Sequence, residues 1–259
     1  MLLGADKKAL KAYYEASYRG REPAIPRGLY NVRYLWLFRK FSKYLSSKLR
    51  VLDVGCGSGE FFYHLASTDI YGIDIAGSAI QTAHNRFNRS YLVVGDAENL
   101  PFVNNCFSLV IVSAVTEHVK NPFKAIREAA RVLKTDGMLV LDTPNNMNLE
   151  RTVGTHGHLW QFSIEQIEEM LKHAGLRIVR LEATGRFIFY IVFNHASKLF
   201  PIPGVYRNLY LKLESKKLQT LYLKAIPFIL MLFELEDAIW KALGLKTSYL
   251  IYAEAVKKK

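Results

Sequence analysis

The feature that most constrains this chain is a run of glycines directly after an apolar segment, VLDVGCGSG at residues 51–59. Glycine at every second position indicates a tight turn with unusual dihedrals, where any Cβ would block a ligand lying on the backbone. Nicotinamide dinucleotides bind a similar turn, but their pattern is G-x-G-x-x-G. Here the third glycine comes one residue earlier and Glu60 occupies the dinucleotide position, where a carboxylate would repel pyrophosphate. The turn therefore predicts a nucleoside ligand without a phosphate bridge.

Segments with strand character alternate with helical segments from residue 49 onward. The expected strands are 50–54, 70–74, 91–94, 108–112, 138–141, 176–181 and, near the end, 249–256. The expected helices between the first six are 60–66, 78–87, 122–133 and 164–174. Two further helices, 6–18 and 30–48, precede the first strand. Such alternation predicts a parallel sheet, because each right-handed crossover needs a helix to cover a sheet face.

Acidic side chains stand at the ends of the first three expected strands. Asp74 ends the second strand, about twenty residues after the first glycine, where a carboxylate accepts from both ribose hydroxyls. Asp96 ends the third strand and can accept from the exocyclic amine of adenine. Asp53, just before the turn, can hold that loop or a cationic amino-acid group. Ligands of open α/β sheets bind at the carboxyl ends of the strands, where all three carboxylates fall.

Five segments carry a family resemblance: VLDVGCGSGEF, YGIDIAGSAI, GDAENLPF, FSLVIVSAVTEHV and RVLKTDGMLVLDTPN. In this order they resemble successive motifs of class I S-adenosylmethionine-dependent methyltransferases, closest to the branch of the ubiquinone and menaquinone biosynthesis methyltransferases. The resemblance covers roughly residues 30–183. It implies S-adenosylmethionine as cofactor, S-adenosylhomocysteine as product, and a cofactor site made by Asp53, Gly55, Cys56, Gly57, Gly59, Asp74, Ile75, Asp96, Ala97, Glu98, Ser113, Val115 and His118.

The expected fold is a doubly wound α/β structure with a seven-stranded mixed sheet whose last strand is antiparallel. Residues 1–48 are interpreted as N-terminal helices that form a lid, and 49–185 as the cofactor-binding core. Residues 186–246, rich in aromatic and aliphatic side chains and interrupted by prolines, are interpreted as a helical insertion. It can form an acceptor cap, an interface between copies, or a basic amphipathic surface. Residues 247–259 complete the sheet.

The segment after the fourth strand, Ala114 to Val119, bears on the reaction. It lacks the Asn/Asp-Pro-Pro-aromatic and Pro-Cys elements of methylases that modify nucleic-acid bases. Quinone O-methyltransferases have a similar Glu-x-x-Glu-His stretch that can bind a divalent metal. Here Glu117 and His118 are present, but Ala114 replaces the first glutamate, so no metal is expected. The favoured reaction is methyl transfer to oxygen or carbon of a small-molecule or lipid-like acceptor.

The loop after the fifth strand contains two candidate catalytic residues, His156 and His158. Histidine titrates near neutral pH and can remove a proton from an acceptor. The loop ends at Ser163, and a serine followed by Gln166 three residues later is typical of a capping box at the start of a helix. Structural roles for both histidines stay open. The aromatic residues assigned to acceptor binding are Tyr14, Tyr18, Trp160 and Phe162.

Two other functions stay open. A formal charge of +12 attracts polyanions, so an RNA methyltransferase is one alternative. The other is a non-catalytic nucleoside-binding module, because the same fold can serve without catalysis.

No apolar run is long enough to span a membrane, although peripheral membrane contact and a homo-oligomer both remain open. Two cysteines make neither a disulfide framework nor a zinc site, which favours a reducing cytoplasm.

Overall fold

The computed structural model describes residues 7–18, 32–45, 49–65, 69–88, 90–145, 157–184, 216–243 and 250–258. Its helices are α1 (Lys7–Tyr18), α3 (Val32–Phe41), α4 (Gly77–Arg86), α5 (Pro122–Val132), α6 (Ile164–His173) and α10 (Lys216–Ala242). Its strands are β1 (Arg50–Val54), β2 (Asp69–Asp74), β3 (Tyr91–Val94), β4 (Phe107–Ser113), β5 (Leu133–Pro144), β6 (Leu176–Thr184) and β7 (Leu250–Lys257). Short 3-10 helices are η1 (Ser42–Tyr44), η2 (Glu60–His64) and η3 (Thr116–His118).

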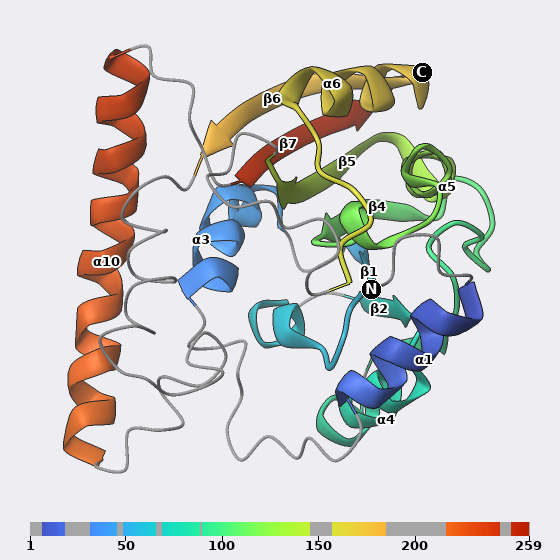
Figure 1. Ribbon diagram of the computed structural model, residues 1–259, viewed down its shortest axis with the longest axis horizontal. Helices are drawn as coiled ribbons and strands as arrows, with labels where there is room; N and C mark the ends of the chain where they lie inside the picture. The colour runs from blue at the N-terminus through green and yellow to red at the C-terminus, as the bar shows by residue number, and fades with distance from the viewer. Residues whose placement is uncertain are drawn as a thin grey trace.

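In the described part of the chain, seven strands form one sheet in the order β3-β2-β1-β4-β5-β7-β6 (Figure 1). β1 pairs in parallel with β2 and β4, β2 with β3, and β4 with β5. β7 lies between β5 and β6 and is antiparallel to both. The expected mixed sheet with an antiparallel last strand is therefore confirmed. The division into four segments along the chain stays a prediction.

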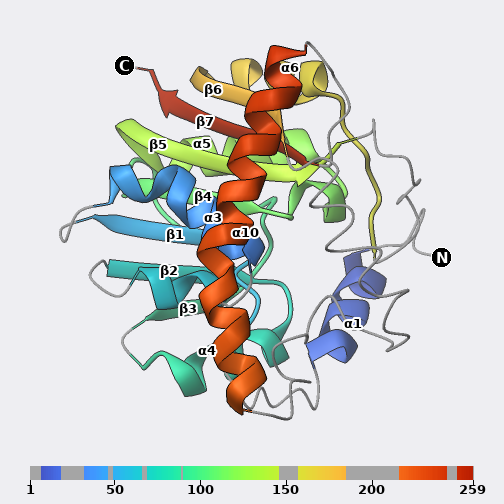
Figure 2. The same cartoon turned by 90° about the vertical axis from the view of Figure 1, so that its left-hand side faces the viewer.

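Both faces of the sheet are buried, because successive strand residues point to opposite sides and both sets are apolar. Leu52 and Val110 pack on one face with residues of α5 and α6. Val51 and Leu109 pack on the other face with residues of α3 and η2. α10 contacts α3 and runs across this second face on its outer side (Figure 2). The core is thus a central sheet between two helical layers.

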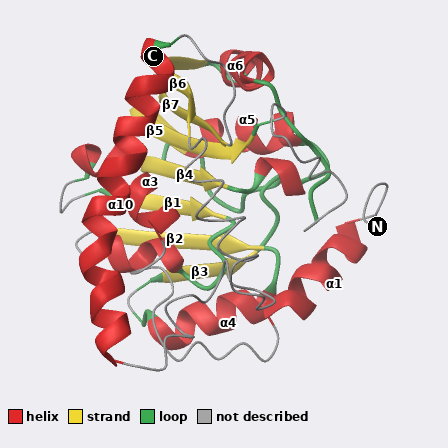
Figure 3. Ribbon diagram, turned by 60° about the vertical axis from the view of Figure 1, so that its left-hand side comes forward, coloured by secondary structure: helices red, strands yellow, loops and turns green. Residues whose placement is uncertain are grey.

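The site described below forms where the parallel strands end. In Figure 3 the arrowheads of β1 to β4 point toward the side of the molecule that carries α1. α1 packs against α4, the helix that follows β2. The N-terminal helix that the sequence suggested as a lid therefore lies at the carboxyl edge of the sheet.

Four elements differ from the sequence expectation. In place of the expected helix 60–66, Glu60–His64 forms the 3-10 helix η2, since the short connection to β2 favours the tighter turn. The expected helix 30–48 gives way to η1 after Phe41. β5 extends beyond 138–141 at both ends, because Leu133 pairs with Phe107 of β4 and Pro144 pairs with Leu250 of β7. Pro227 lies inside α10 rather than interrupting the helix. It is exposed, so water can bond the carbonyl that loses its helical partner.

The predicted ends of α6 are confirmed. Ser163 Oγ accepts from the Gln166 amide at 3.3 Å, and Gln166 Oε1 accepts from the Ser163 amide at 2.8 Å. Gly175, with a φ of 76°, follows the helix as a left-handed C-terminal cap. The capping box sets where the loop after β5 enters the helix, and Gly175 sets where the helix ends. No helix among the described residues has the length and apolar character needed to cross a membrane.

Candidate functional site

The glycine turn follows β1 and is fastened to the end of β2. Gly55 and Gly57 have positive φ angles of 70° and 54°. The amides of Gly55 and Cys56 both donate to the carbonyl oxygen of Ile73, at 2.7 and 3.0 Å. A Cβ added at Gly57 would lie 2.7 Å from the Tyr18 hydroxyl of α1. The turn therefore needs glycine for its backbone conformation and for the close approach of α1.

The carboxylate of Asp74 ties this turn to the start of α4. Its Oδ2 accepts from the Gly57 amide and its Oδ1 from the Ala76 amide, each at 2.9 Å. Each carboxylate oxygen keeps a second lone pair that a ligand hydroxyl can use. Burial raises the pKa of Asp74 to about 6, although both backbone amides act to lower it. Asp74 thus fastens the loop and remains an acceptor.

Two further carboxyl groups are buried near the ends of β1 and β5, the two strands that flank β4. Asp53 in β1 is 2% exposed and Asp142 in β5 is 1% exposed. Burial raises the pKa of Asp53 well above its usual range, and the charges of Glu60, Asp74 and Asp142 raise it further. A cationic ligand group would relieve this repulsion. The edge of the sheet therefore suits a ligand that carries positive charge.

A lysine of α1 covers the acids that follow β3. Lys7 Nζ lies 2.6 Å from Asp96 Oδ2 and 2.8 Å from Glu98 Oε2. Burial acts to raise the pKa of Asp96, but the hydrogen bonds from Lys7 and the Glu98 amide hold it below its ordinary value. Glu98 Oε1 also accepts from the amides of Lys120 and Asn121, at 2.9 and 3.1 Å. Because Glu98 anchors this loop, its predicted cofactor contact stays a prediction.

Glu15 fastens α1 across the N-terminus of α4. Its carboxylate accepts from the amides of Gly77 at 2.7 Å and Ser78 at 3.0 Å. The Ser78 hydroxyl also donates to the backbone oxygen of Glu15 at 3.1 Å. Hydrogen bonds from Ser78 and Gly77 lower the pKa of Glu15. The negative charge at a helix N-terminus is favourable, so these contacts hold α1 over the edge of the sheet.

Tyr14 lies on the side of α1 that faces the strand ends. Its hydroxyl is buried and has no hydrogen-bond partner among the described residues. Its ring packs edge-on against His118 with centroids 5.6 Å apart. Burial, followed by the charge of Glu117, raises the pKa of Tyr14 well above its usual range, so it is a neutral phenol. Since an unsatisfied buried hydroxyl is costly, this position fits a polar group of a ligand.

The segment after β4 brings Glu117, His118 and His158 together. Glu117 is 1% exposed, and its Oε1 lies 3.8 Å from His118 Nε2. Its Oε2 accepts from the Thr143 hydroxyl at 3.1 Å. His118 Nδ1 lies 3.1 Å from the carbonyl oxygen of Gly157, and the rings of His118 and His158 have centroids 4.8 Å apart. The sequence suggested His118 and His158 separately, and the fold makes them neighbours.

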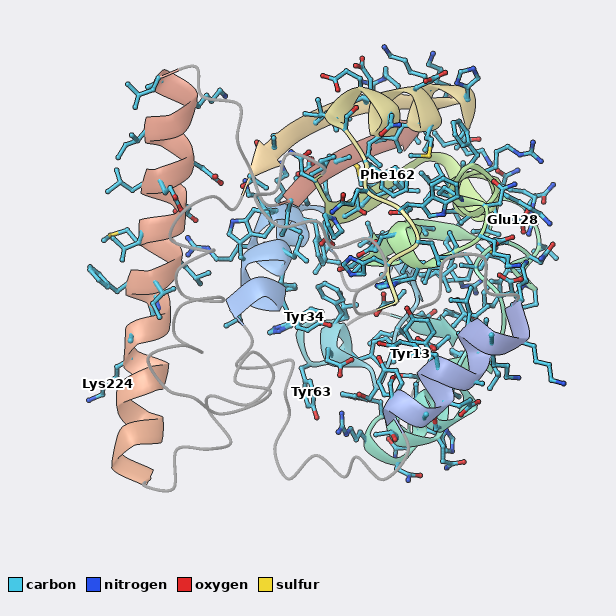
Figure 4. The ribbon with its side chains drawn as sticks, in the orientation of Figure 1. Tyr13, Tyr34, Tyr63, Glu128, Phe162 and Lys224 are labelled. Carbon is cyan, nitrogen blue, oxygen red and sulfur yellow. The ribbon has the colours of Figure 1, made fainter. Side chains whose placement is uncertain are left out.

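The remaining predicted residues have different surroundings. Val115 is buried against the turn, and its Cγ2 would lie 2.5 Å from a Cβ added at Gly55. The Trp160 indole is 41% exposed and donates to the Val119 carbonyl at 2.8 Å. Phe162 is 4% exposed and packs in the core cluster shared with β5 (Figure 4). The acceptor contacts of both aromatic residues stay predictions.

His156 lies outside the described residues. The other predicted cofactor residues lie at the carboxyl ends of β1 to β4: Gly59, Ile75 and Ala97 follow β1, β2 and β3, and Ser113 ends β4. Sequence reasoning missed four polar residues of this edge: Lys7, Glu15, Asp142 and Thr143. Only Asp142 and Thr143 could have been found from the sequence, since they directly follow the expected strand 138–141.

Residues 52–141 match a family model described as a methyltransferase domain. The uncharacterized protein MJ1252 of Methanocaldococcus jannaschii is 31% identical over 142 residues, which are 54% of this chain and 53% of that protein. The 27-O-demethylrifamycin SV methyltransferase of Amycolatopsis mediterranei is 30% identical over 146 residues, which are 49% of this chain and 53% of that protein. The chain thus spans about half the length of these two relatives.

Among solved structures, the fold is similar to that of phosphoethanolamine N-methyltransferase 2 from Haemonchus contortus, determined with S-adenosyl-L-methionine. The TM-score is 0.63 at 18% identity, covering 100% of this chain and 59% of that one. At this identity the likeness concerns the fold alone.

Proposed function

We propose that this chain, whose residues 52–141 match a methyltransferase domain, is a class I S-adenosylmethionine-dependent methyltransferase that methylates a small-molecule or lipid-like acceptor. The observation that carries the proposal is the set of carboxylates gathered around the glycine turn. Asp53 and Asp74 lie at the ends of β1 and β2 and Asp96 lies just after β3, so all three belong to adjacent parallel strands, and the turn after β1 is built on glycines with positive φ.

The residues present fit the cofactor group by group. Asp74 has lone pairs for the ribose hydroxyls, and the segment Asp96–Ala97 follows β3, where the adenine edge is expected. The acidic surroundings of Asp53 favour the cationic end of the cofactor. S-adenosylmethionine supplies a methyl group on a sulfonium, which an acceptor takes by in-line displacement. The protein therefore mainly has to position the acceptor and exclude water.

The acceptor is proposed to bind beside His118 and His158, beneath α1. Tyr14 offers it a buried hydroxyl, and a neutral imidazole can take a proton from an acceptor hydroxyl or an acidic carbon. Oxygen and carbon are favoured because the sequence segment after β4 resembles that of quinone methyltransferases and lacks the elements of base methylases.

Two measurements test the proposal. Calorimetry should show that S-adenosylhomocysteine binds the purified chain and that NAD does not. Cell extract incubated with methyl-labelled cofactor should then yield a labelled small molecule or lipid. Binding of NAD instead of S-adenosylhomocysteine would contradict the cofactor assignment.

The same experiment separates the alternatives. Labelled RNA, with an affinity that remains specific at physiological salt, would contradict the proposed acceptor class. Nonspecific attraction through scattered lysines should instead fall steeply with salt. Cofactor binding without any labelled product in a broad range of extracts would favour the non-catalytic module.

A further inference from the structure

Glu117, His118 and His158 form a group of potential metal ligands. Each offers one ligand atom, and these atoms all lie within 4.8 Å of one another. Ligands of a transition metal lie about 2.0–2.2 Å from the ion, so two ligand atoms of a tetrahedral site lie about 3.3–3.6 Å apart. The separation of 3.8 Å between Glu117 Oε1 and His118 Nε2 is close to that spacing. Side-chain rotations that move the ligand atoms by about 1 Å would bring the whole group to it.

The hydrogen bonds around this group are those that metal ligands usually have. Because the Gly157 carbonyl can only accept, the contact at 3.1 Å assigns the proton of His118 to Nδ1. Nε2 then presents its lone pair toward Glu117. On the other side, the Thr143 hydroxyl donates to Glu117 Oε2 and leaves Oε1 directed at the imidazole. Such outer contacts orient ligands and fix the histidine tautomer.

Burial separates this group from an ordinary surface cluster. Glu117 is 1% exposed and Thr143 is fully buried, while both histidines are partly buried. Buried charged groups in proteins are usually paired or coordinate a metal, so a bound cation suits these surroundings. In the sequence, Ala114 argued against a metal because it replaces a glutamate. The fold brings a third ligand from the loop after β5, which no spacing within 114–118 could reveal.

We propose that Glu117, His118 and His158 bind a divalent transition-metal ion of the Zn²⁺ or Co²⁺ kind. Two imidazoles and one carboxylate suit these ions, whereas Mg²⁺ and Ca²⁺ prefer oxygen ligands alone. Three protein ligands leave coordination positions open for a small molecule. If the proposed function also holds, an acceptor oxygen would bind there and the ion would lower the pKa of the acceptor hydroxyl, with His118 and His158 serving as ligands in place of the role of base.

The test is metal binding by the full chain after removal of metals with a chelator. Calorimetric titration with ZnCl₂ gives the affinity, and the visible spectrum of added Co²⁺ reports the geometry and the ligand type. Glu117→Gln and His158→Ala should each weaken Zn²⁺ binding by about tenfold or more, since each removes a ligand. Thr143→Val, which keeps the side-chain shape, should weaken it by about 10–100-fold by removing an outer hydrogen bond.

A matched control is His173→Ala on α6. His173 and Glu169 form an exposed histidine–carboxylate pair with a separation of 4.0 Å, so this variant removes an imidazole outside the proposed site. Zn²⁺ affinity of this variant should equal that of the unmodified chain. Thermal unfolding without metal shows whether each variant folds. If Glu117→Gln does not fold, His158→Ala decides, because His158 lies in a loop rather than in the sheet.

Two outcomes would overturn the inference. One is a Kd for Zn²⁺ and Co²⁺ no better than about 1 mM in the unmodified chain. The other is unchanged affinity in both Glu117→Gln and His158→Ala. Titration of the same metal-free sample with S-adenosylhomocysteine tests the proposed methyltransferase function independently of the metal site. A chain that binds S-adenosylhomocysteine but no metal refutes the metal site alone, and the reverse result refutes the proposed function alone.

Discussion

The pKa of Asp74 provides a quantitative test of its place in the cofactor site. In the folded chain this pKa is raised to about 6, chiefly by burial. Ribose hydroxyls donate best to an ionised carboxylate. If only the ionised form binds S-adenosylhomocysteine well, the affinity should follow the ionised fraction, which is about 9% at pH 5 and about 91% at pH 7. The expected gain is about tenfold, or about 1.4 kcal/mol.

The assay is calorimetric titration with S-adenosylhomocysteine at pH 5, 6 and 7, for the unmodified chain and for Asp74→Asn. The ligand's own carboxyl and amino groups titrate outside this range. Asparagine keeps an oxygen for the Ala76 amide but sets an amino group against the Gly57 amide. Asp74→Asn should therefore bind more weakly, by about 1–3 kcal/mol at pH 7, and its affinity should be flat between pH 5 and 7.

The contribution of Asp74 to the stability of the free chain changes with pH in the opposite direction to its contribution to binding, and thermal unfolding at each pH shows whether the chain stays folded. A folded-state pKa raised from 3.8 to about 6 means that the folded chain binds more protons than the unfolded chain in this range. The contribution of Asp74 to stability is therefore present at low pH and lost as the pH rises through 6, by up to about 3 kcal/mol. Equal pH dependence in both proteins would refute the reasoning and point to another group, such as Asp53.

Three further predictions concern the turn, the lid and the histidines. Gly57→Ala should weaken S-adenosylhomocysteine binding and lower stability by more than Gly175→Ala. Both glycines have a positive φ, which costs a residue with a Cβ about 1–2 kcal/mol, but an added Cβ meets nothing within 4 Å at Gly175. Thermal unfolding and calorimetry compare the two variants. Glu15→Ala should cost about 1 kcal/mol or less of stability and speed hydrogen exchange in α1 and at the start of α4. An unchanged exchange pattern would contradict its role as a fastener. Replacing His156 and His158 together with alanine should leave S-adenosylhomocysteine affinity nearly unchanged and lower turnover about 10²–10⁴-fold, and full turnover would assign the loop a structural role.

The chemical character of the site follows from contacts between segments far apart in the chain. Glu117 and His118 are adjacent in sequence, but Thr143 and His158 reach them from β5 and the loop after it. Lys7 similarly reaches Asp96 across 89 positions. Each of these contacts depends on where two strands end or where α1 packs, so no local pattern contains them.

By itself, the sequence determined the sheet, the glycine turn and the acids beside it. These features are local: apolar alternation specifies strands, and glycine spacing permits positive φ at Gly55 and Gly57. Even the antiparallel last strand was correctly expected. Only the tertiary structure decided which polar residues meet, because a parallel sheet gathers the ends of strands that are distant in the chain. Burial at that edge then sets the pKa values of Asp53 and Asp74, and burial depends on the packing of the whole chain.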